Sequence, residues 1–142
     1  MSIWKTPKPD LESLSSLQAR TMASHLGIEI VGCTGDSLTA RMPVDHRTLQ
    51  PHGRLHGGAS VALAETVGSI AANMVLDPND HIGVGLEINA NHVRPVKDGF
   101  VFATAKPEAL GRTTQIWAIT DEAGRLVCIS RFTVAVISAS KA

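Results

Sequence analysis

The sequence has no excess of charge of either sign. Its 142 residues include 13 Lys and Arg against 13 Asp and Glu, and the basic residues form no block anywhere in the chain. Proteins that bind nucleic acid through phosphate charge carry such a block, so we expect no nucleic-acid partner. The length allows one domain with a sizeable core and is short for two, which predicts a single domain over residues 1–142.

Cysteine is scarce too, because Cys33 and Cys128 stand far apart and form no pair at metal-ligand spacing. Two isolated cysteines favour a reducing compartment over a disulfide scaffold. The first ten residues also lack the apolar core of a signal peptide, which Pro7 and Pro9 would interrupt. We therefore expect a cytoplasmic protein.

Long apolar runs free of polar residues are missing as well. The nearest candidate covers residues 57–76, close to the roughly 20 residues that cross a bilayer. It contains a carboxylate and four further polar side chains, namely Glu65, Ser60, Thr66, Ser69 and Asn73. A helix buried in a folded domain explains this composition better than a membrane span, so we expect no membrane association.

The most informative stretch that is present covers residues 50–65, Gln-Pro-His-Gly-Arg-Leu-His-Gly-Gly-Ala-Ser-Val-Ala-Leu-Ala-Glu. Pro51 and Gly53 disfavour a helix in its first half, whereas the run after Gly57 favours a buried helix. The first N–H groups of a helix lack intrahelical partners and lie at the positive end of its dipole. They can therefore bind a carbonyl oxygen that gains negative charge. The junction therefore predicts a chemical site at the N-terminus of a helix.

Glu65 lies about two turns into that helix, among Ala, Val and Leu side chains. Burying a carboxylate is costly unless it has a partner or a task. The residues alone allow a structural carboxylate paired with an arginine, or a mid-helix residue at an exposed position. They equally allow a catalytic group that takes a proton from water or attacks a carbonyl carbon. Ser69, one turn later on the same face, is placed to bind the water or the carboxylate, or to bond back to the helix.

The remaining pattern predicts the α+β class, with an antiparallel sheet against one long helix. The long helix is apolar all round, which predicts burial on every side. In the strand after it, Leu86, Ile88 and Ala90 are expected on one face, and Glu87, Asn89 and Asn91 on the other. The expected elements are a helix at about 10–26 capped by Asp10, a hairpin at about 28–44, a loop at 45–56, a helix at about 58–76 and strands at about 83–94, 99–106, 113–121 and 126–137.

Four short motifs occur in order along the chain: Ile3-Trp4, Met42-Pro43-Val44-Asp45, Leu55-His56-Gly57-Gly58-Ala59-Ser60, and Gly85-Leu86-Glu87-Ile88-Asn89-Ala90-Asn91-His92. Together they resemble the hotdog-fold acyl-CoA thioesterases, in particular the small bacterial group that acts on aromatic acyl-CoA esters and aryl carrier proteins. The resemblance implies a hotdog fold, in which an antiparallel sheet wraps around a long central helix. It also implies hydrolysis of a coenzyme A or carrier-protein thioester to free acid and thiol, without a cofactor.

The resemblance implies roles for four residues. Glu65 is the base or nucleophile, and Gln50, His56 and Gly57 of one chain face the Glu65 of a neighbouring subunit. This arrangement implies a homo-oligomer, at least a dimer and, in this family, a tetramer of paired dimers. From the residues alone, His56 can equally be a capping or surface group, and Gln50 a solvated loop residue.

The resemblance also implies a coenzyme A site. The strand end that carries His92 and Arg94, together with the turn around Arg112, meets the nucleotide and phosphates, for which arginine is chemically suited. We expect Arg94 to contribute most. Taken alone, basic side chains at strand ends are equally explained as solvated groups. At His52, members of the family carry a bulky apolar or aromatic residue beside the acyl pocket, so this chain presents a polar ring there.

Other chemistries have weaker support. His46, His52 and His56 share no helical face and no further ligand completes a set, so we expect no metal. Ser60 lacks the Gly-x-Ser-x-Gly elbow of serine hydrolases, because Ala62 stands where the second glycine belongs. Two alternatives remain open: a hotdog hydratase or dehydratase acting on a 3-hydroxyacyl chain, and a non-catalytic acyl-CoA-binding protein. Only a thioesterase releases free thiol.

Overall fold

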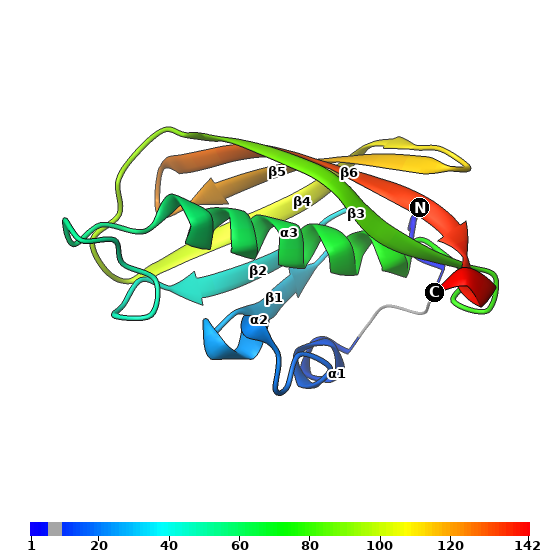
Figure 1. Cartoon of the computed structure of the whole chain (residues 1–142), viewed down its shortest axis with the longest axis horizontal. Coiled ribbons are helices and arrows are strands. Elements are labelled where there is room, and N and C mark those ends of the chain that lie inside the picture. Colours follow the sequence, from blue (N-terminus) through cyan, green and yellow to red (C-terminus); the bar gives the residue numbers. More distant parts are fainter. Residues whose placement is uncertain (6–9) are drawn as a thin grey trace.

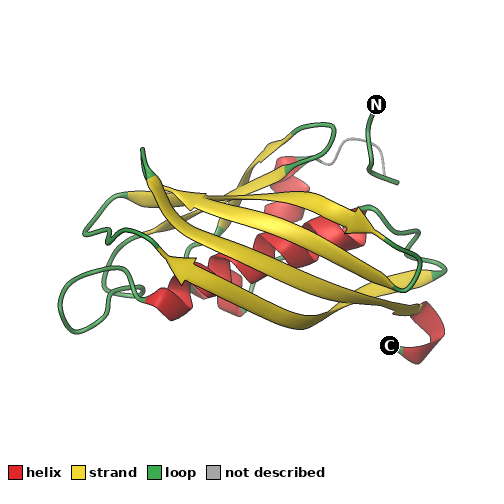
Figure 2. Cartoon of the chain, turned by 90° about the horizontal axis from the view of Figure 1, so that it is seen from above, coloured by secondary structure: helices red, strands yellow, loops and turns green. Residues whose placement is uncertain are grey.

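A sheet and one long helix make up most of the computed structural model, which describes residues 1–5 and 10–142. Six antiparallel strands form the sheet, in the order β1-β2-β4-β5-β6-β3. The helix α3 (Gly57–Met74) lies along one face of it (Figures 1 and 2). The strands are β1 (Glu29–Cys33), β2 (Leu38–Pro43), β3 (His81–His92), β4 (Phe100–Leu110), β5 (Thr114–Glu122) and β6 (Leu126–Ser138). Pro7 and Pro9 lie outside the described residues.

Small residues bring α3 close to the sheet. Ala64 and Ala71 are fully buried against it. At Gly68, an added Cβ would lie 2.8 Å from a ring carbon of Phe132, so only glycine fits between the helix and that ring. Trp117 and Phe132 are almost completely buried and are the largest side chains under the helix. The predicted α+β architecture, an antiparallel sheet around a central helix, is confirmed.

The opposite face of α3 is not covered by the sheet. Glu65, Thr66 and Ser69 are half-buried and Asn73 is exposed. These residues recur at helical spacing and therefore form one stripe. The prediction that the helix is buried on every side is wrong, because its high mean apolarity concealed this polar stripe.

The predicted helix over 10–26 is instead two short helices, α1 (Leu11–Ser16) and α2 (Met22–His25). Asp10 caps the first one as predicted. Between them the backbone turns at Arg20, which has a left-handed φ of 61°. The step of five residues from Leu17 to Met22 fits the helical period poorly, but apolar spacing alone did not reveal the break at Arg20.

β3 forms one edge of the sheet and contains a bulge. Its register against β6 shifts between Gly85 and Glu87, so Leu86 is the extra residue and is 64% exposed. The prediction that Leu86 shares a face with Ile88 and Ala90 is therefore wrong, because a bulge breaks the alternation of faces. Ile88 and Ala90 share a face as predicted and pack against the core.

Within the part of the chain that the structure describes, no helix has both the length and the apolar character required to cross a membrane.

Candidate active site

The loop between β2 and α3 is braced by local bonds. Asp45 and Arg47 form an ion pair of 2.7 Å, and the guanidinium lowers the pKa of the Asp45 carboxyl to about 2. The buried Thr48 hydroxyl accepts the Asp45 N–H at 3.1 Å and donates to the last carbonyl of β2 at 2.8 Å. The loop therefore presents Gln50 and His56 from a fixed frame.

His56 is the N-cap of α3. Its Nδ1 accepts the N–H of Gly58 at 2.8 Å, and its own N–H donates to the carbonyl of Thr48 at 2.8 Å. A neutral ring that accepts at Nδ1 carries its proton on Nε2. The exposed His56 ring thus caps the helix, one of the roles expected from the sequence, and its Nε2–H remains as a hydrogen-bond donor.

Gly57 provides a second donor. The N–H groups of the next three residues are bonded to His56, two to its carbonyl and one to its ring. The described residues supply no such partner for the Gly57 N–H. An added Cβ at this glycine would lie 2.8 Å from Nε2 of His92, so the imidazole of His92 covers the helix end closely. A ligand that accepts this N–H would therefore lie beside the His92 ring.

A cavity of about 320 Å³ opens at this end of α3 and brings four predicted site residues together. Gln50, Gly57, His92 and Arg94 all line it, as does the buried Ser60. These residues come from the loop before α3, from α3 itself and from the end of β3. The cavity therefore joins two residues expected to meet the thioester, Gln50 and Gly57, with two expected to meet the coenzyme, His92 and Arg94, while His56 is not among its lining residues.

Two of the polar groups of Gln50 already form hydrogen bonds within its loop. Its side-chain oxygen accepts the N–H of His52, and its own N–H donates to the carbonyl of Arg54 at 2.7 Å. The amide NH₂ is the group that Gln50 retains for a ligand. The ring of His52 is exposed and lines none of the cavities described here.

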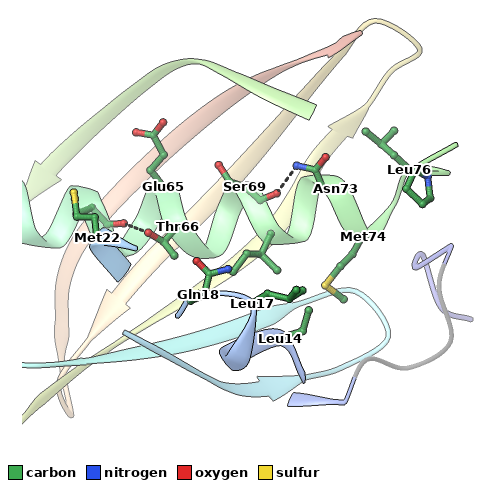
Figure 3. Close-up of a pocket in the computed structure, with 13 residues that line it drawn as sticks. Leu14, Leu17, Gln18, Met22, Glu65, Thr66, Ser69, Asn73, Met74 and Leu76 are labelled. Atoms are coloured by element: carbon green, nitrogen blue, oxygen red, sulfur yellow. Dashed lines mark hydrogen bonds between the residues drawn. The ribbon is translucent and has the colours of Figure 1, made fainter. Parts of the chain in front are cut away.

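Glu65 and Ser69 lie elsewhere, in a groove of about 680 Å³ on the outer face of α3. Figure 3 shows them one turn apart on the helix, with the N-terminal segment across the groove. A Cβ on Gly85 of β3 would lie 3.0 Å from a carboxylate oxygen of Glu65 and 3.0 Å from the ring of Phe132. Glycine at this position therefore makes room for the Glu65 carboxylate.

The cavity at the helix end and the groove share no lining residue. Gly57 and Glu65 are eight residues apart on one helix, which separates their Cα atoms by about 12 Å. A carbonyl carbon held at the Gly57 N–H is therefore beyond the reach of the Glu65 carboxylate of the same chain.

Arg94 lies between the cavity at the helix end and a third cavity of about 480 Å³. Its Nη1 donates to the carbonyl of Leu126 at 3.0 Å, which fixes the guanidinium against β6. Lys97 and Arg125 line the third cavity as well. Arg125 escaped the sequence-based prediction, because only the fold brings the β5–β6 turn beside the loop after β3.

Arg112 does not join this group within one chain. It lies in the turn between β4 and β5, at the end of the sheet opposite the N-terminus of α3 (Figure 1). Lys106, a further basic residue on β4, lines neither of these two cavities. Its Nζ lies 3.9 Å from a carboxylate oxygen of Asp36.

One buried carboxylate lies outside the three cavities. Asp121 on β5 has no exposed surface, and the described residues offer neither of its carboxylate oxygens a hydrogen bond. Burial raises its pKa to about 7. Cys128 is paired with it on β6, and burial, together with the Asp121 charge, raises the pKa of the thiol. The described residues also contain no group of three His, Cys, Asp or Glu side chains arranged to hold a metal ion.

Comparison with known proteins identifies the family. Residues 52–128 match the model of the thioesterase superfamily. The chain belongs to that family. It is 47% identical over 137 residues to the 1,4-dihydroxy-2-naphthoyl-CoA hydrolase of Escherichia coli, covering 95% of this chain and 99% of that protein. It is 47% identical over 137 residues to the proofreading thioesterase EntH of Cronobacter turicensis, covering 95% and 98%.

A solved structure is equally similar. A mutant thioesterase from Pseudomonas aeruginosa superposes with a TM-score of 0.94 at 46% identity, covering 96% of this chain and 99% of that one. The expected family, the hotdog fold and the reaction class of a thioester hydrolase are thereby confirmed.

Proposed function

We propose that this thioester hydrolase acts on acyl-CoA thioesters, using a site shared by two chains. The observation that carries the proposal is the unpartnered N–H of Gly57 at the start of α3, in a cavity lined also by Gln50 and Arg94. A helix N-terminus stabilises an oxygen that becomes negative, which is what a thioester carbonyl does when it is attacked.

In the proposed reaction the thioester oxygen accepts the Gly57 N–H, with the Nε2–H of His56 close to the same helix end. Glu65 takes a proton from a water molecule, whose oxygen bonds to the carbonyl carbon. Collapse of the tetrahedral intermediate breaks the C–S bond, and the leaving sulfur takes up the proton, giving acid and thiol. In the covalent alternative Glu65 itself attacks the carbon, and water then hydrolyses the mixed anhydride. Neither route requires a metal or a redox cofactor.

The separation of Gly57 from Glu65 supports a shared site. Because one chain holds the two groups about 12 Å apart along α3, the carboxylate that serves a given Gly57 has to come from another chain. We therefore propose a homodimer as the smallest active unit, assembled into a tetramer of paired dimers. Gln50 and His56 of one chain then meet Glu65 and Ser69 of its partner.

The proposed acyl group is aromatic. Support comes from one relative, a 1,4-dihydroxy-2-naphthoyl-CoA hydrolase, whose named substrate carries an aromatic acyl group. The apolar groove beside Glu65 is also consistent with an aryl group. His52, whose backbone N–H donates to the Gln50 side chain, distinguishes this chain from the pattern expected of its relatives.

The proposed coenzyme site lies at the end of β3. Arg94, beside His92, is placed to bind phosphates of coenzyme A while the thioester occupies the cavity at the helix end. Arg112 belongs to this site only if a second chain brings its β4–β5 turn to it.

The test is thiol release from a panel of aryl, short-chain and long-chain acyl-CoAs and from an aryl carrier protein. We expect the fastest release from an aryl-CoA. A hotdog hydratase would instead add water to an enoyl-CoA without releasing thiol, and an acyl-CoA-binding protein would bind and return each ester intact. Either result contradicts the proposal.

A further inference from the structure

The N-terminal segment, residues 10–26, forms one side of the groove that contains Glu65. Leu14, Leu17, Gln18 and Met22 line the groove along the side of α3 that Glu65 and Ser69 point away from (Figure 3). Leu17 is 74% exposed and Met22 is 64% exposed, so both apolar side chains stand largely in solvent when the groove is empty. Nothing in the chemistry of the catalytic groups explains an apolar wall at this place.

The break between α1 and α2 gives this wall its shape. In an uninterrupted helix, residues five apart point in directions that differ by roughly 140°, so Leu17 and Met22 would face different sides. The left-handed turn at Arg20 changes the direction of the chain between them. As a result both side chains line the same groove.

The groove is large enough for a bulky acyl group. It runs along α3 from Glu65 past Ile70 to Met74, a distance of about 14 Å at the rise of a helix. Its volume of about 680 Å³ falls in the range of small-molecule sites. An acetyl group would touch only the Glu65 end, whereas an aryl or octanoyl group would extend along the apolar wall.

We propose that Leu17 and Met22 are specificity-determining residues, which form the acyl-binding wall and give the enzyme its preference for acyl groups with a large apolar body. This inference rests on the proposed function. A large acyl group covers the two exposed side chains when it binds, and removal of apolar surface from water then favours it over a short one. The wall acts on the acyl group and leaves the thioester chemistry to the groups on α3.

The test compares Leu17→Ala, Met22→Ala and the double variant with the unchanged protein. kcat/KM is measured for acetyl-CoA, octanoyl-CoA and benzoyl-CoA. We expect the double variant to lose about tenfold on octanoyl-CoA and benzoyl-CoA and less than about twofold on acetyl-CoA, so that the ratio between large and small acyl groups falls. Both side chains are exposed, so the variants are expected to fold.

Leu26→Ala is the matched control. Leu26 belongs to the same segment and packs against the core, but it does not line the groove. Its loss should lower the melting temperature and leave the ratio unchanged. An unchanged ratio in the double variant, or an equal loss on all three esters, overturns the inference while the proposed function stands. Absence of thiol release from every ester by the unchanged protein overturns the proposed function, and the inference with it.

Discussion

The two cavities that border α3 differ in chemistry as well as in position. The cavity at the N-terminus of the helix offers donors, namely the Gly57 N–H, the Gln50 amide and the Arg94 guanidinium. The groove on the outer face offers an acceptor and base, Glu65, against an apolar wall. Each contains what the other lacks. In the proposed function one chain therefore carries two half-sites, one for the thioester oxygen and coenzyme and one for the acyl group and the base.

The groove half-site should be the more sensitive to a single change. Glu65→Gln removes the proposed base or nucleophile and keeps the shape, so kcat should fall by about 10²–10⁴ with little change in substrate affinity. Steady-state thiol release measures this. Glu87→Gln, an exposed carboxylate on β3 outside the cavities described, should retain full activity. Near-normal turnover by a folded Glu65→Gln protein contradicts the mechanism.

The helix-end half-site can be damaged without removing any functional group. Gly57→Ala places a Cβ against the His92 ring, where the separation would be 2.8 Å, so the ring or the helix end must shift. We expect a loss of about 10² in kcat, since misplacement by about 1 Å is costly in catalysis. Gly32→Ala, with its nearest contact at 3.5 Å, is the control and should be silent.

A second substitution tests whether the contact with the His92 ring causes the loss of turnover in Gly57→Ala. His92→Ala combined with Gly57→Ala should restore part of the lost turnover, because the smaller side chain leaves room for the new Cβ. A double variant as poor as the product of the two single losses would show that the His92 ring is not what the Cβ displaces.

The coenzyme part of the helix-end half-site should affect binding only. Arg94→Ala should raise KM for an acyl-CoA by about tenfold with kcat nearly unchanged, because a phosphate contact is equal in ground and transition states. The same thioester on N-acetylcysteamine, which lacks phosphates, should show no difference. Equal losses on both esters would assign Arg94 to the fold, through its bond to Leu126, instead of to the coenzyme.

A change outside both half-sites should leave activity intact and act on stability. The pKa of Asp121 is raised from 3.8 to about 7 in the folded state. Between pH 4 and 7 the folded chain therefore keeps a proton that the unfolded chain has lost, so stability falls as pH rises. The full loss is on the order of 4 kcal/mol. Asp121→Asn removes this titration.

Urea unfolding at pH 5 and pH 8 tests the effect. Asp121→Asn should lose less stability than the unchanged protein between these two pH values, with kcat and KM unaltered at either. Parallel losses for the two proteins would mean that the Asp121 carboxyl titrates at its ordinary pKa in the folded chain.

The sequence predicts those features that depend on neighbouring residues. Pro51, Gly53 and the glycines after His56 locate the start of α3, and alternation with turn residues locates the strands. Helical spacing places Glu65 and Ser69 on one face. These local rules act within a few residues and hold in the structure.

The sequence does not predict features that depend on long-range packing. The bulge at Leu86 arises where β3 pairs with β6. The alternation of apolar and polar residues along β3 alone does not indicate it. Arg125 lines the same cavity as Arg94 only because the fold brings two loops together at one end of the sheet. The groove wall of Leu17 and Met22 depends on the turn at Arg20, which apolar spacing alone made part of a helix. The division of the site into two cavities needs the fold as a whole.

The most direct test of the shared site uses two inactive proteins. Glu65→Ala has an intact helix-end half-site, and His56→Ala has an intact groove half-site. After equal mixing and verified subunit exchange, half of the dimers are mixed and each mixed dimer has one complete site. Thiol release should therefore recover to about a quarter of the unchanged protein's rate. Recovery of activity is the result that the divided site predicts. No recovery above the sum of the two separate proteins would place Glu65 and His56 in one chain's site and contradict it.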